Sequence, residues 1–354
     1  MGFQPSWVIY GATGYTGRLI AEAAVKAGMR PILAGRNESE LSKLGATLKL
    51  SHRCFALDAR GAVEKGLSGI RLVLNTAGPF AITSQPIANG ALATGAHYLD
   101  IAGEVADFRA LHRMHERAVD NGVMLLSGVG FGVLPSECLA LKLFQLLPHA
   151  AVMKIGLITD GGASRGTLET LLNCARVPGV VRKRGQLVAA AAADESWQVD
   201  LKQLDLGRGA KRRLISNPWR GDLFSVPFSA AVPQLETYFQ VPAAVAMLLR
   251  RPQLLQGGWV SRLLHRAVRW MPPGPSAKTR AKSRSYVVAY AIDPDRREKT
   301  LLLEGPDAYT VTAECALECV KRVLAGATWD GFATPAQIFG TEPLSLPIFK
   351  LSER

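Results

Sequence analysis

The sequence predicts an α/β protein whose first part is a doubly wound parallel sheet. Two observations lead there. Short apolar segments alternate with helical stretches over roughly the first 130 residues. The first apolar segment, residues 7–10, runs straight into a glycine-rich turn that is followed by a helical stretch. With 354 residues the chain is also long for one domain, so we expect two.

The predicted strands of this sheet are short apolar runs bounded by turn residues. They cover residues 7–10, 31–34, 54–57, 72–75, 97–101 and 123–127. The first helix is expected over 15–27, where Gly28 ends it, as Gly commonly does. A second helix over 38–48 follows Asn37, a typical N-cap residue. Strands that alternate with helices in this way form a parallel sheet.

The turn after the first strand reads GATGYTG, residues 11–17. In a strand-turn-helix unit the first glycine permits the tight turn, and the second lets the backbone approach a pyrophosphate. The third lets helix and strand pack closely. The helix N-terminus offers N–H groups and a partial positive charge to the phosphates. A turn without a ligand is the alternative, but the complete unit favours a bound dinucleotide.

The end of the second strand indicates which dinucleotide is bound. Sites that prefer NAD place Asp or Glu there, to hold the ribose 2′-hydroxyl. Here the sequence reads AGRN, with Arg36 about where a 2′-phosphate would lie. A guanidinium group suits phosphate geometry, so we predict NADP(H). The alternative is a solvated surface arginine.

Two later strand ends support a ligand at the same edge, since ligands bind at the carboxyl ends of parallel strands. Asp58 follows the third strand and can reach the adenine. The segment NTAGPF, residues 75–80, follows the fourth strand. Its small residues let the backbone approach the nicotinamide half, although taken alone it is also compatible with a simple turn.

The motifs GATGYTG, AGRN, NTAGPF, HYLDIAGE and GFGVLPSE occur in this order. Further segments fit in the second half, among them WRGD at 219–222, EGPDAY at 304–309 and GFATP at 331–335. Together they resemble the saccharopine dehydrogenase-like oxidoreductases, a family that includes the bacterial trans-acting enoyl reductases. The resemblance covers nearly the whole chain.

The resemblance implies a Rossmann domain over 1–132 and a second α+β domain over 133–309. The second domain is inserted before a segment, about 310–354, that returns to the first, and it would serve substrate binding, dimerisation or membrane contact. The implied cofactor contacts come from the strand ends. They are Gly11, Thr13, Gly14, Tyr15, Thr16, Gly17, Arg36, Asn37, Asp58, Asn75, Ala77, Gly78 and Pro79.

Three polar residues at the end of the fifth strand are the catalytic candidates. Hydride comes from the cofactor, but reduction of an alkene also needs a proton donor. Tyr98 can donate a proton, while Asp100 or Glu104 can tune it or bind an amine. In the alternative interpretation Tyr98 and Asp100 tie the loop together by hydrogen bonds, because buried polar groups need partners.

The formal net charge is +13, and residues 237–292 contain no Asp or Glu. Within them, a helix over 259–271 carries apolar residues at helical spacing, arginines on its other face and a tryptophan near each end. This pattern is typical of a helix on an anionic membrane surface. The alternative is a surface helix packed on the core. We expect residues 278–284 to form a mobile loop. Nucleic acid is not expected, because no recognised reader motif accompanies the charge.

Cysteines and histidines suggest no metal. The five cysteines lack a CxxC pair, and Cys315 and Cys319 share a helix face, which favours core packing in a reducing compartment. His112 and His115 are expected on a surface face. The chain starts almost directly on a strand, and no apolar run approaches the roughly 20 residues of a bilayer span. We therefore expect a cytoplasmic protein, with peripheral attachment to the inner face of the membrane left open.

Three functions follow from these features. The first is an NADPH-dependent reductase, enoyl reductase-like, acting on a lipid-like or polyketide-derived small molecule or acyl group. The second is a membrane-associated NADP(H)-binding protein without robust catalysis. The third is an amino-acid C–N reductase of the saccharopine reductase type, which the apolar second domain disfavours. A homodimer is left open.

Overall fold

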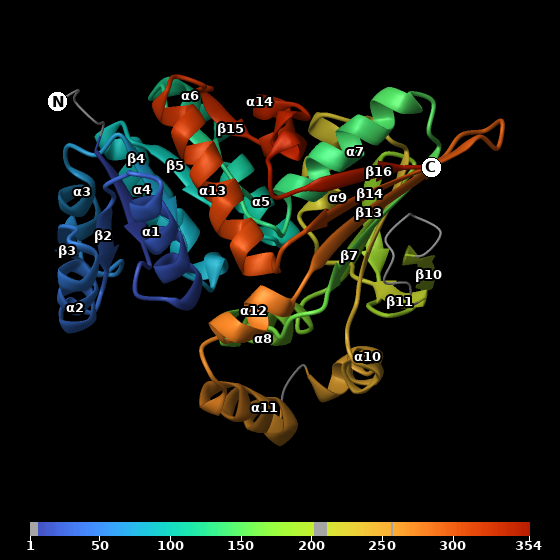
Figure 1. Cartoon of the computed structure of the whole chain (residues 1–354), viewed down its shortest axis with the longest axis horizontal. Coiled ribbons are helices and arrows are strands. Elements are labelled where there is room, and N and C mark those ends of the chain that lie inside the picture. The colour runs from blue at the N-terminus through green and yellow to red at the C-terminus, as the bar shows by residue number, and fades with distance from the viewer. Residues whose placement is uncertain (1–5, 202–210, 256–257) are drawn as a thin grey trace. The chain divides into compact units, whose positions relative to one another are not determined.

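A seven-stranded parallel sheet is the centre of the N-terminal half of the chain (Figure 1). The computed structural model describes residues 6–201, 211–255 and 258–354. The strands are β1 (Trp7–Tyr10), β2 (Ile32–Gly35), β3 (His52–Cys54), β4 (Leu72–Asn75), β5 (His97–Asp100), β6 (Met124–Leu126) and β15 (Gly331–Ala333). Their order is β15-β6-β5-β4-β1-β2-β3, and it changes direction at β1, between β2 and β4. The predicted doubly wound fold is confirmed.

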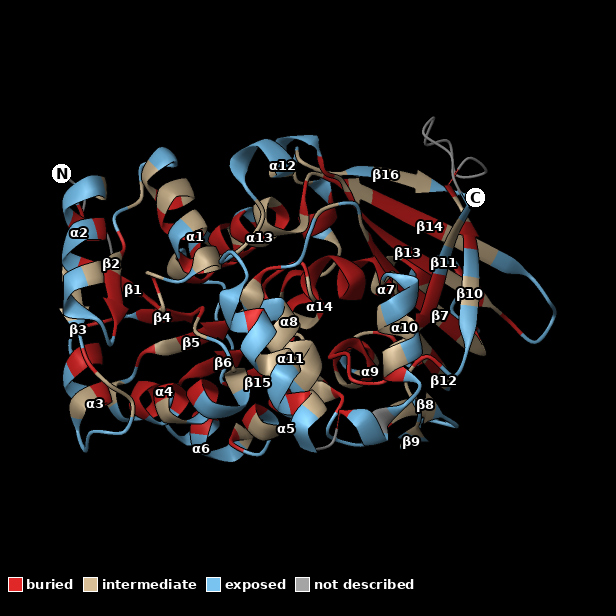
Figure 2. Cartoon of the chain, turned by 90° about the horizontal axis from the view of Figure 1, so that it is seen from below, coloured by how far each residue is buried: buried red, intermediate tan, exposed pale blue. Residues whose placement is uncertain are grey.

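Helices cover both faces of this sheet (Figure 2). One face carries α1 (Tyr15–Lys26), α2 (Glu38–Leu48) and α13 (Ala308–Leu324). The other carries α3 (Ala62–Leu67), α4 (Phe80–Thr94), α5 (Val105–His112) and α6 (His115–Asp120). Because water reaches neither face, β1 and β4 are buried along their whole length. Helix α13 also buries Cys315 and Cys319, which confirms their expected place in the core.

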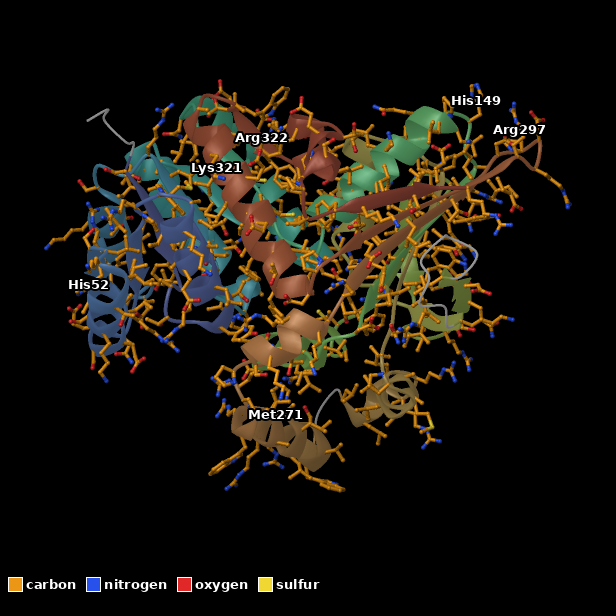
Figure 3. All side chains as sticks on the ribbon, viewed as in Figure 1. His52, His149, Met271, Arg297, Lys321 and Arg322 are labelled. Atoms are coloured by element: carbon orange, nitrogen blue, oxygen red, sulfur yellow. The ribbon has the colours of Figure 1, made fainter. Side chains whose placement is uncertain are left out.

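The third strand differs from its prediction. It covers His52–Cys54 instead of 54–57, and His52 hydrogen bonds to Glu38 over 2.8 Å at the surface (Figure 3). The apolar residue Phe55 misled the prediction, because it is buried in the loop after the strand. Its ring packs on Tyr10 with centroids 5.1 Å apart, so its burial needs no strand.

The chain divides into two units. The first comprises Met1–Leu134 and Tyr309–Ile338, and the second comprises Pro135–Ala308 and Phe339–Arg354. Residues up to Ile338 therefore return to the first unit, where β15 pairs with β6. The end of the chain differs from the expected return of 310–354. β16 (Lys350–Glu353) pairs with β14 (Glu298–Gly305) of the second unit, because β14 has a free edge for an antiparallel neighbour.

The second unit is built on a mixed sheet with the path β10-β11-β12-β7-β13-β14-β16. Besides β14 and β16, the strands of this sheet are β7 (Val152–Thr159), β8 (Gly179–Lys183), β9 (Gln186–Ala190), β10 (Ser196–Asp200), β11 (Lys211–Ser216), β12 (Gln234–Phe239) and β13 (Ser285–Ile292). Only the pairing of β12 with β7 is parallel among the described strands of this sheet. This arrangement confirms the second α+β domain.

The remaining α-helices belong to the second unit, except the last of them, most of which belongs to the first. They are α7 (Leu134–Leu146), α8 (Arg165–Cys174), α9 (Asp222–Ser225), α10 (Ala243–Leu249), α11 (Gly258–Trp270), α12 (Ala277–Lys282) and α14 (Pro335–Phe339). Helix α12 corrects the expected loop over 278–284. Ser276 caps it by accepting a hydrogen bond from the Thr279 N–H over 3.1 Å, and its Ala, Lys and Arg residues favour a helix.

Candidate cofactor and active site

The glycine turn between β1 and α1 is packed closely against its surroundings. Gly11 has a φ of +85°, and a Cβ added there would lie 2.8 Å from the Ala77 nitrogen. A Cβ on Gly17 would lie 2.3 Å from the Gly11 carbonyl oxygen. The first and third glycines thus have the packing roles that the motif predicts.

Gly14 has a different place in the same turn. It is the N-cap of α1 and is exposed, and the first turn of the helix has no acidic residue. Its backbone is therefore open to an anionic ligand at the positive end of the helix dipole. These features of the turn fit a pyrophosphate.

The loop after β4 is shaped by a buried side chain. Asn75 accepts a hydrogen bond from the Ala77 N–H over 3.0 Å and donates to the Tyr98 hydroxyl over 3.1 Å. Asn75 itself is fully buried, whereas Gly78 is exposed and Ala77 and Pro79 are partly exposed. Asn75 therefore holds the loop, and the backbone of the next residues is what a cofactor can approach.

Arg36, Asn37 and Asp58 follow the strands that lie beyond β1. Burial raises the pKa of Tyr10, while the nearby Arg36 charge lowers it and the Asp58 charge raises it. Arg36 and Asp58 are both exposed and both lie near the Tyr10 hydroxyl. Asn37 instead caps α2, accepting from the Glu40 N–H over 3.2 Å. The structure thus brings two of the three polar candidates to one end of β1.

Tyr98 and Asp100 are completely buried. The Tyr98 hydroxyl donates to Asp100 over 2.9 Å, and Asp100 also accepts from the Ser127 hydroxyl over 2.7 Å and from the Gly128 N–H over 3.0 Å. Burial raises the pKa of Asp100 and, more strongly, that of Tyr98. This geometry agrees with the alternative interpretation, in which the two residues tie the loops after β5 and β6 together.

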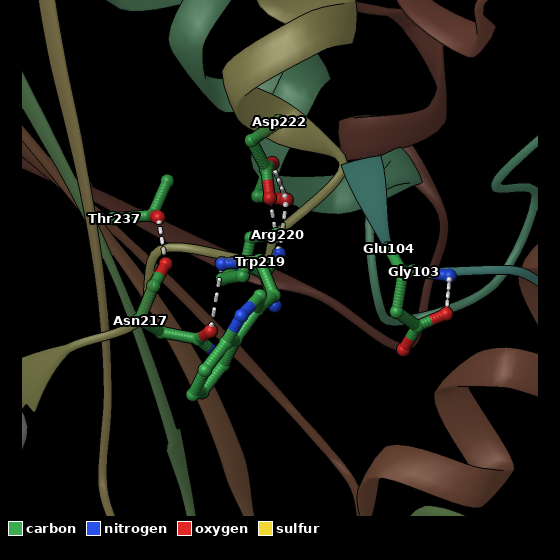
Figure 4. Close-up of polar contacts among 8 residues, drawn as sticks. Gly103, Glu104, Asn217, Trp219, Arg220, Asp222 and Thr237 are labelled. Carbon is green, nitrogen blue, oxygen red and sulfur yellow. Dashed lines mark hydrogen bonds and ion pairs between the residues drawn. The ribbon is translucent and has the colours of Figure 1, made fainter. Parts of the chain in front are cut away.

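Glu104 lies at the N-cap of α5 and is partly exposed. One of its carboxylate oxygens accepts from the Gly103 N–H over 3.0 Å (Figure 4). One helical turn later, Asp107 is buried, and that burial together with the Glu104 and Asp100 charges raises its pKa to about 9. Burial and the neighbouring carboxylates thus favour the protonated form of Asp107. The sequence analysis missed it, and the available signal was the spacing of three residues from Glu104.

The WRGD segment of the second unit forms a buried polar cluster (Figure 4). Arg220 forms an ion pair with Asp222, which also accepts a hydrogen bond from the Ser136 hydroxyl. The Trp219 N–H donates to the Asn217 side chain over 3.3 Å, and the Asn217 carbonyl accepts from Thr237 over 2.6 Å. These contacts connect β12 to the segment before α9.

Histidines in the first unit have structural partners. His97 and His115 each accept a hydrogen bond on Nδ1, from the N–H groups of Met124 and Phe332 respectively, both over 3.1 Å. The rings of His112 and His115 stack with centroids 6.1 Å apart. Over the described part of the chain, no three His, Cys, Asp or Glu residues are arranged to hold a metal ion.

This strand order, with a glycine turn at the start of α1 and small residues after β4, defines the class of nicotinamide dinucleotide-binding Rossmann domains. Residues 7–126 match the family model described as the saccharopine dehydrogenase NADP binding domain. The first unit of the chain is thus similar over these residues to the NADP-binding domain of saccharopine dehydrogenase.

Curated relatives carry a more specific name. A putative trans-acting enoyl reductase of Mycobacterium tuberculosis (strain ATCC 25618 / H37Rv) is 30% identical over 182 residues, which are 47% of this chain and 43% of the relative. The trans-acting enoyl reductase of Mycobacterium leprae (strain TN) is 29% identical over 161 residues, covering 43% of this chain and 38% of the relative. The chain thus spans less than half the length of these relatives.

A solved structure extends the similarity to the whole fold. Apo saccharopine dehydrogenase (L-Glu forming) from Saccharomyces cerevisiae matches with a TM-score of 0.67 over 99% of both chains, at 11% identity. At this identity the match shows a shared fold and carries no conclusion about the substrate.

Proposed function

We propose that the protein is an NADPH-dependent reductase that adds hydride to the carbon–carbon double bond of an acyl-type substrate, lipid-like or polyketide-derived. The observation that carries the proposal is the turn at 11–17, whose glycines are packed or exposed as a pyrophosphate site requires. The names of the two mycobacterial relatives support the enoyl substrate class.

Residues after four strands, β1 to β4, share the binding of NADPH. The backbone of 14–17 receives the pyrophosphate, and Arg36 receives the 2′-phosphate with its guanidinium group. Asp58, whose charge like that of Arg36 acts on Tyr10, is proposed for the adenine side, and the backbone of 77–79 for the nicotinamide half. When bound, the cofactor supplies the hydride, and the protein supplies orientation and the proton.

For the proton we propose the pair Glu104 and Asp107 as its source. Reduction of an enoyl group needs a proton at the carbon next to the carbonyl. Asp107 keeps its proton at neutral pH, and Glu104, with which it hydrogen bonds, is the more exposed of the two carboxyls. Tyr98 and Asp100 are positioning residues, because both are fully enclosed.

The first test is a fluorescence titration of the purified protein with NADPH and NADH, with Arg36→Asp in parallel. We expect NADPH to bind more tightly than NADH, and the variant to lose that preference. A panel of α,β-unsaturated acyl thioesters is then incubated with NADPH deuterated at C4. Deuterium in the saturated product supports the proposal, and NADPH binding without transfer to any acceptor argues against it.

The same assay separates the other candidate functions. An amino-acid C–N reductase would instead consume NADPH with an amine and a 2-oxo acid or a semialdehyde. Binding of NADPH without turnover of either substrate class would favour a protein that uses the dinucleotide as a structural or sensing ligand.

A further inference from the structure

Large apolar side chains are exposed around helix α11 of the second unit. On the helix itself, Trp270 is 82% exposed, Trp259 71% and Leu263 57%. Three more come from the same part of the chain, namely Met247, Leu254 and Met271, of which Met271 is labelled in Figure 3. Exposed tryptophans that gather on one short segment indicate an interaction surface, because water solvates them poorly.

The apolar face of α11 is only partly used for packing. Leu264 packs on a core cluster of the second unit, and Val260 and Val268, four residues before and after it, are also partly or fully buried. At about 100° per residue, Trp259, Leu263 and Trp270 lie within an arc of about 40° beside this packed flank. That arc is exposed to solvent. We call these three residues the exposed stripe.

Arginines border the exposed stripe on its other side. Arg262, Arg266 and Arg269 are exposed, and no salt bridge involves them among residues 6–201, 211–255 and 258–354. Together with Arg176 they line an open groove of about 880 Å³. Since residues 237–292 contain no acidic side chain, this surface suits a partner that is both apolar and anionic.

We propose that α11 docks on an anionic lipid bilayer. The exposed stripe enters the boundary between headgroups and acyl chains, where the amphipathic ring of tryptophan is favoured. Arg262, Arg266 and Arg269 contact the lipid phosphates. The described helices include none that is long and apolar enough to cross the bilayer. This inference stands apart from the proposed reductase activity.

The test is co-sedimentation of the full chain with vesicles of phosphatidylcholine alone or with about 30 mol% phosphatidylglycerol. We expect binding to the anionic vesicles that weakens with added salt, and little binding to the neutral ones. Two triple variants should each weaken binding about tenfold or more, Trp259→Ser/Leu263→Ser/Trp270→Ser and Arg262→Glu/Arg266→Glu/Arg269→Glu. NADPH titration and circular dichroism verify that both remain folded.

A matched control changes the net charge equally at exposed positions of the first unit. The variant Arg71→Glu/Arg113→Glu/Lys321→Glu should reduce vesicle binding by no more than about threefold. The proposal is wrong if the wild-type protein does not bind anionic vesicles. It is wrong too if the control variant loses as much vesicle binding as the arginine variant. It is also wrong if the serine variant binds anionic vesicles as well as the wild-type protein does. If that variant in addition loses self-association, the exposed stripe contacts a second copy of the chain instead.

Discussion

The two units use polar groups in opposite ways. In the first unit the cofactor turn is rich in glycine, and the groups that can bind a ligand are backbone groups at the start of α1. In the second unit the corresponding polar groups are charged side chains. Arg220 and Asp222 neutralise each other inside it, while the arginines of α11 face solvent.

This difference explains why the site of the first unit is easier to predict from the sequence than the polar groups of the second. A backbone site demands glycine at fixed positions, because a Cβ at Gly11 or Gly17 would collide with the turn, and such a site is therefore recognisable in the sequence. A site built from side chains can be made from many residue combinations. Variants in each unit test this difference.

The largest effect is expected for Asp222→Ala in the second unit. It leaves the Arg220 guanidinium buried without its carboxylate, which should lower the free energy of unfolding by about 3–5 kcal/mol. Chemical denaturation measures this loss. The double variant Arg220→Met/Asp222→Leu should recover much of it, and a double variant as unstable as the single one would contradict the explanation.

The next effect is loss of the cofactor in Gly14→Asp. Asp is a good N-cap residue, so α1 should keep its stability, but the carboxylate takes the place and repels the charge of the phosphates. We expect NADPH affinity to fall about a hundredfold or more, or about 3 kcal/mol, in a fluorescence titration. The neutral variant Gly14→Asn measures how much of the loss comes from bulk alone. Equal losses in both would remove charge from the explanation.

A smaller change is expected for Arg36→Asp. Removing the guanidinium group and adding a carboxylate should weaken NADPH binding about tenfold to a hundredfold, while NADH binding is retained or improved. Titration with both nucleotides measures the ratio of the two affinities. A ratio equal to that of the wild-type protein would identify Arg36 as an ordinary surface arginine.

The last prediction concerns the slope of stability against pH, to which Asp107 contributes. Its folded pKa of about 9 exceeds the ordinary value of 3.8, so the folded state binds the extra proton. The stabilising contribution of the Asp107 proton is complete below about pH 4 and is lost as the pH rises toward 9.

Thermal melts of Asp107→Asn between pH 5 and pH 9 test this contribution. The Tm of the variant should fall less steeply with pH than that of the wild-type protein. Asp120→Asn, which removes an exposed carboxylate at the end of α6, should leave the slope unchanged. Parallel curves for Asp107→Asn and wild type would show that Asp107 is ionised throughout.

The doubly wound sheet, the dinucleotide turn and the amphipathic character of α11 could all be predicted from the amino-acid sequence. Each of these depends on local spacing, namely alternating strands and helices, glycines around a turn, and apolar residues every three or four positions. Local patterns of this kind hold wherever the segment lies in the fold.

Only the tertiary structure decided which polar groups are enclosed. It buried Tyr98 and Asp100 together, raised the pKa of Asp107, placed Phe55 in a loop and added β16 to the second sheet. It also left half of the apolar face of α11 without a partner. These outcomes depend on neighbours that are distant in sequence, and burial sets the energy of a polar group through those neighbours.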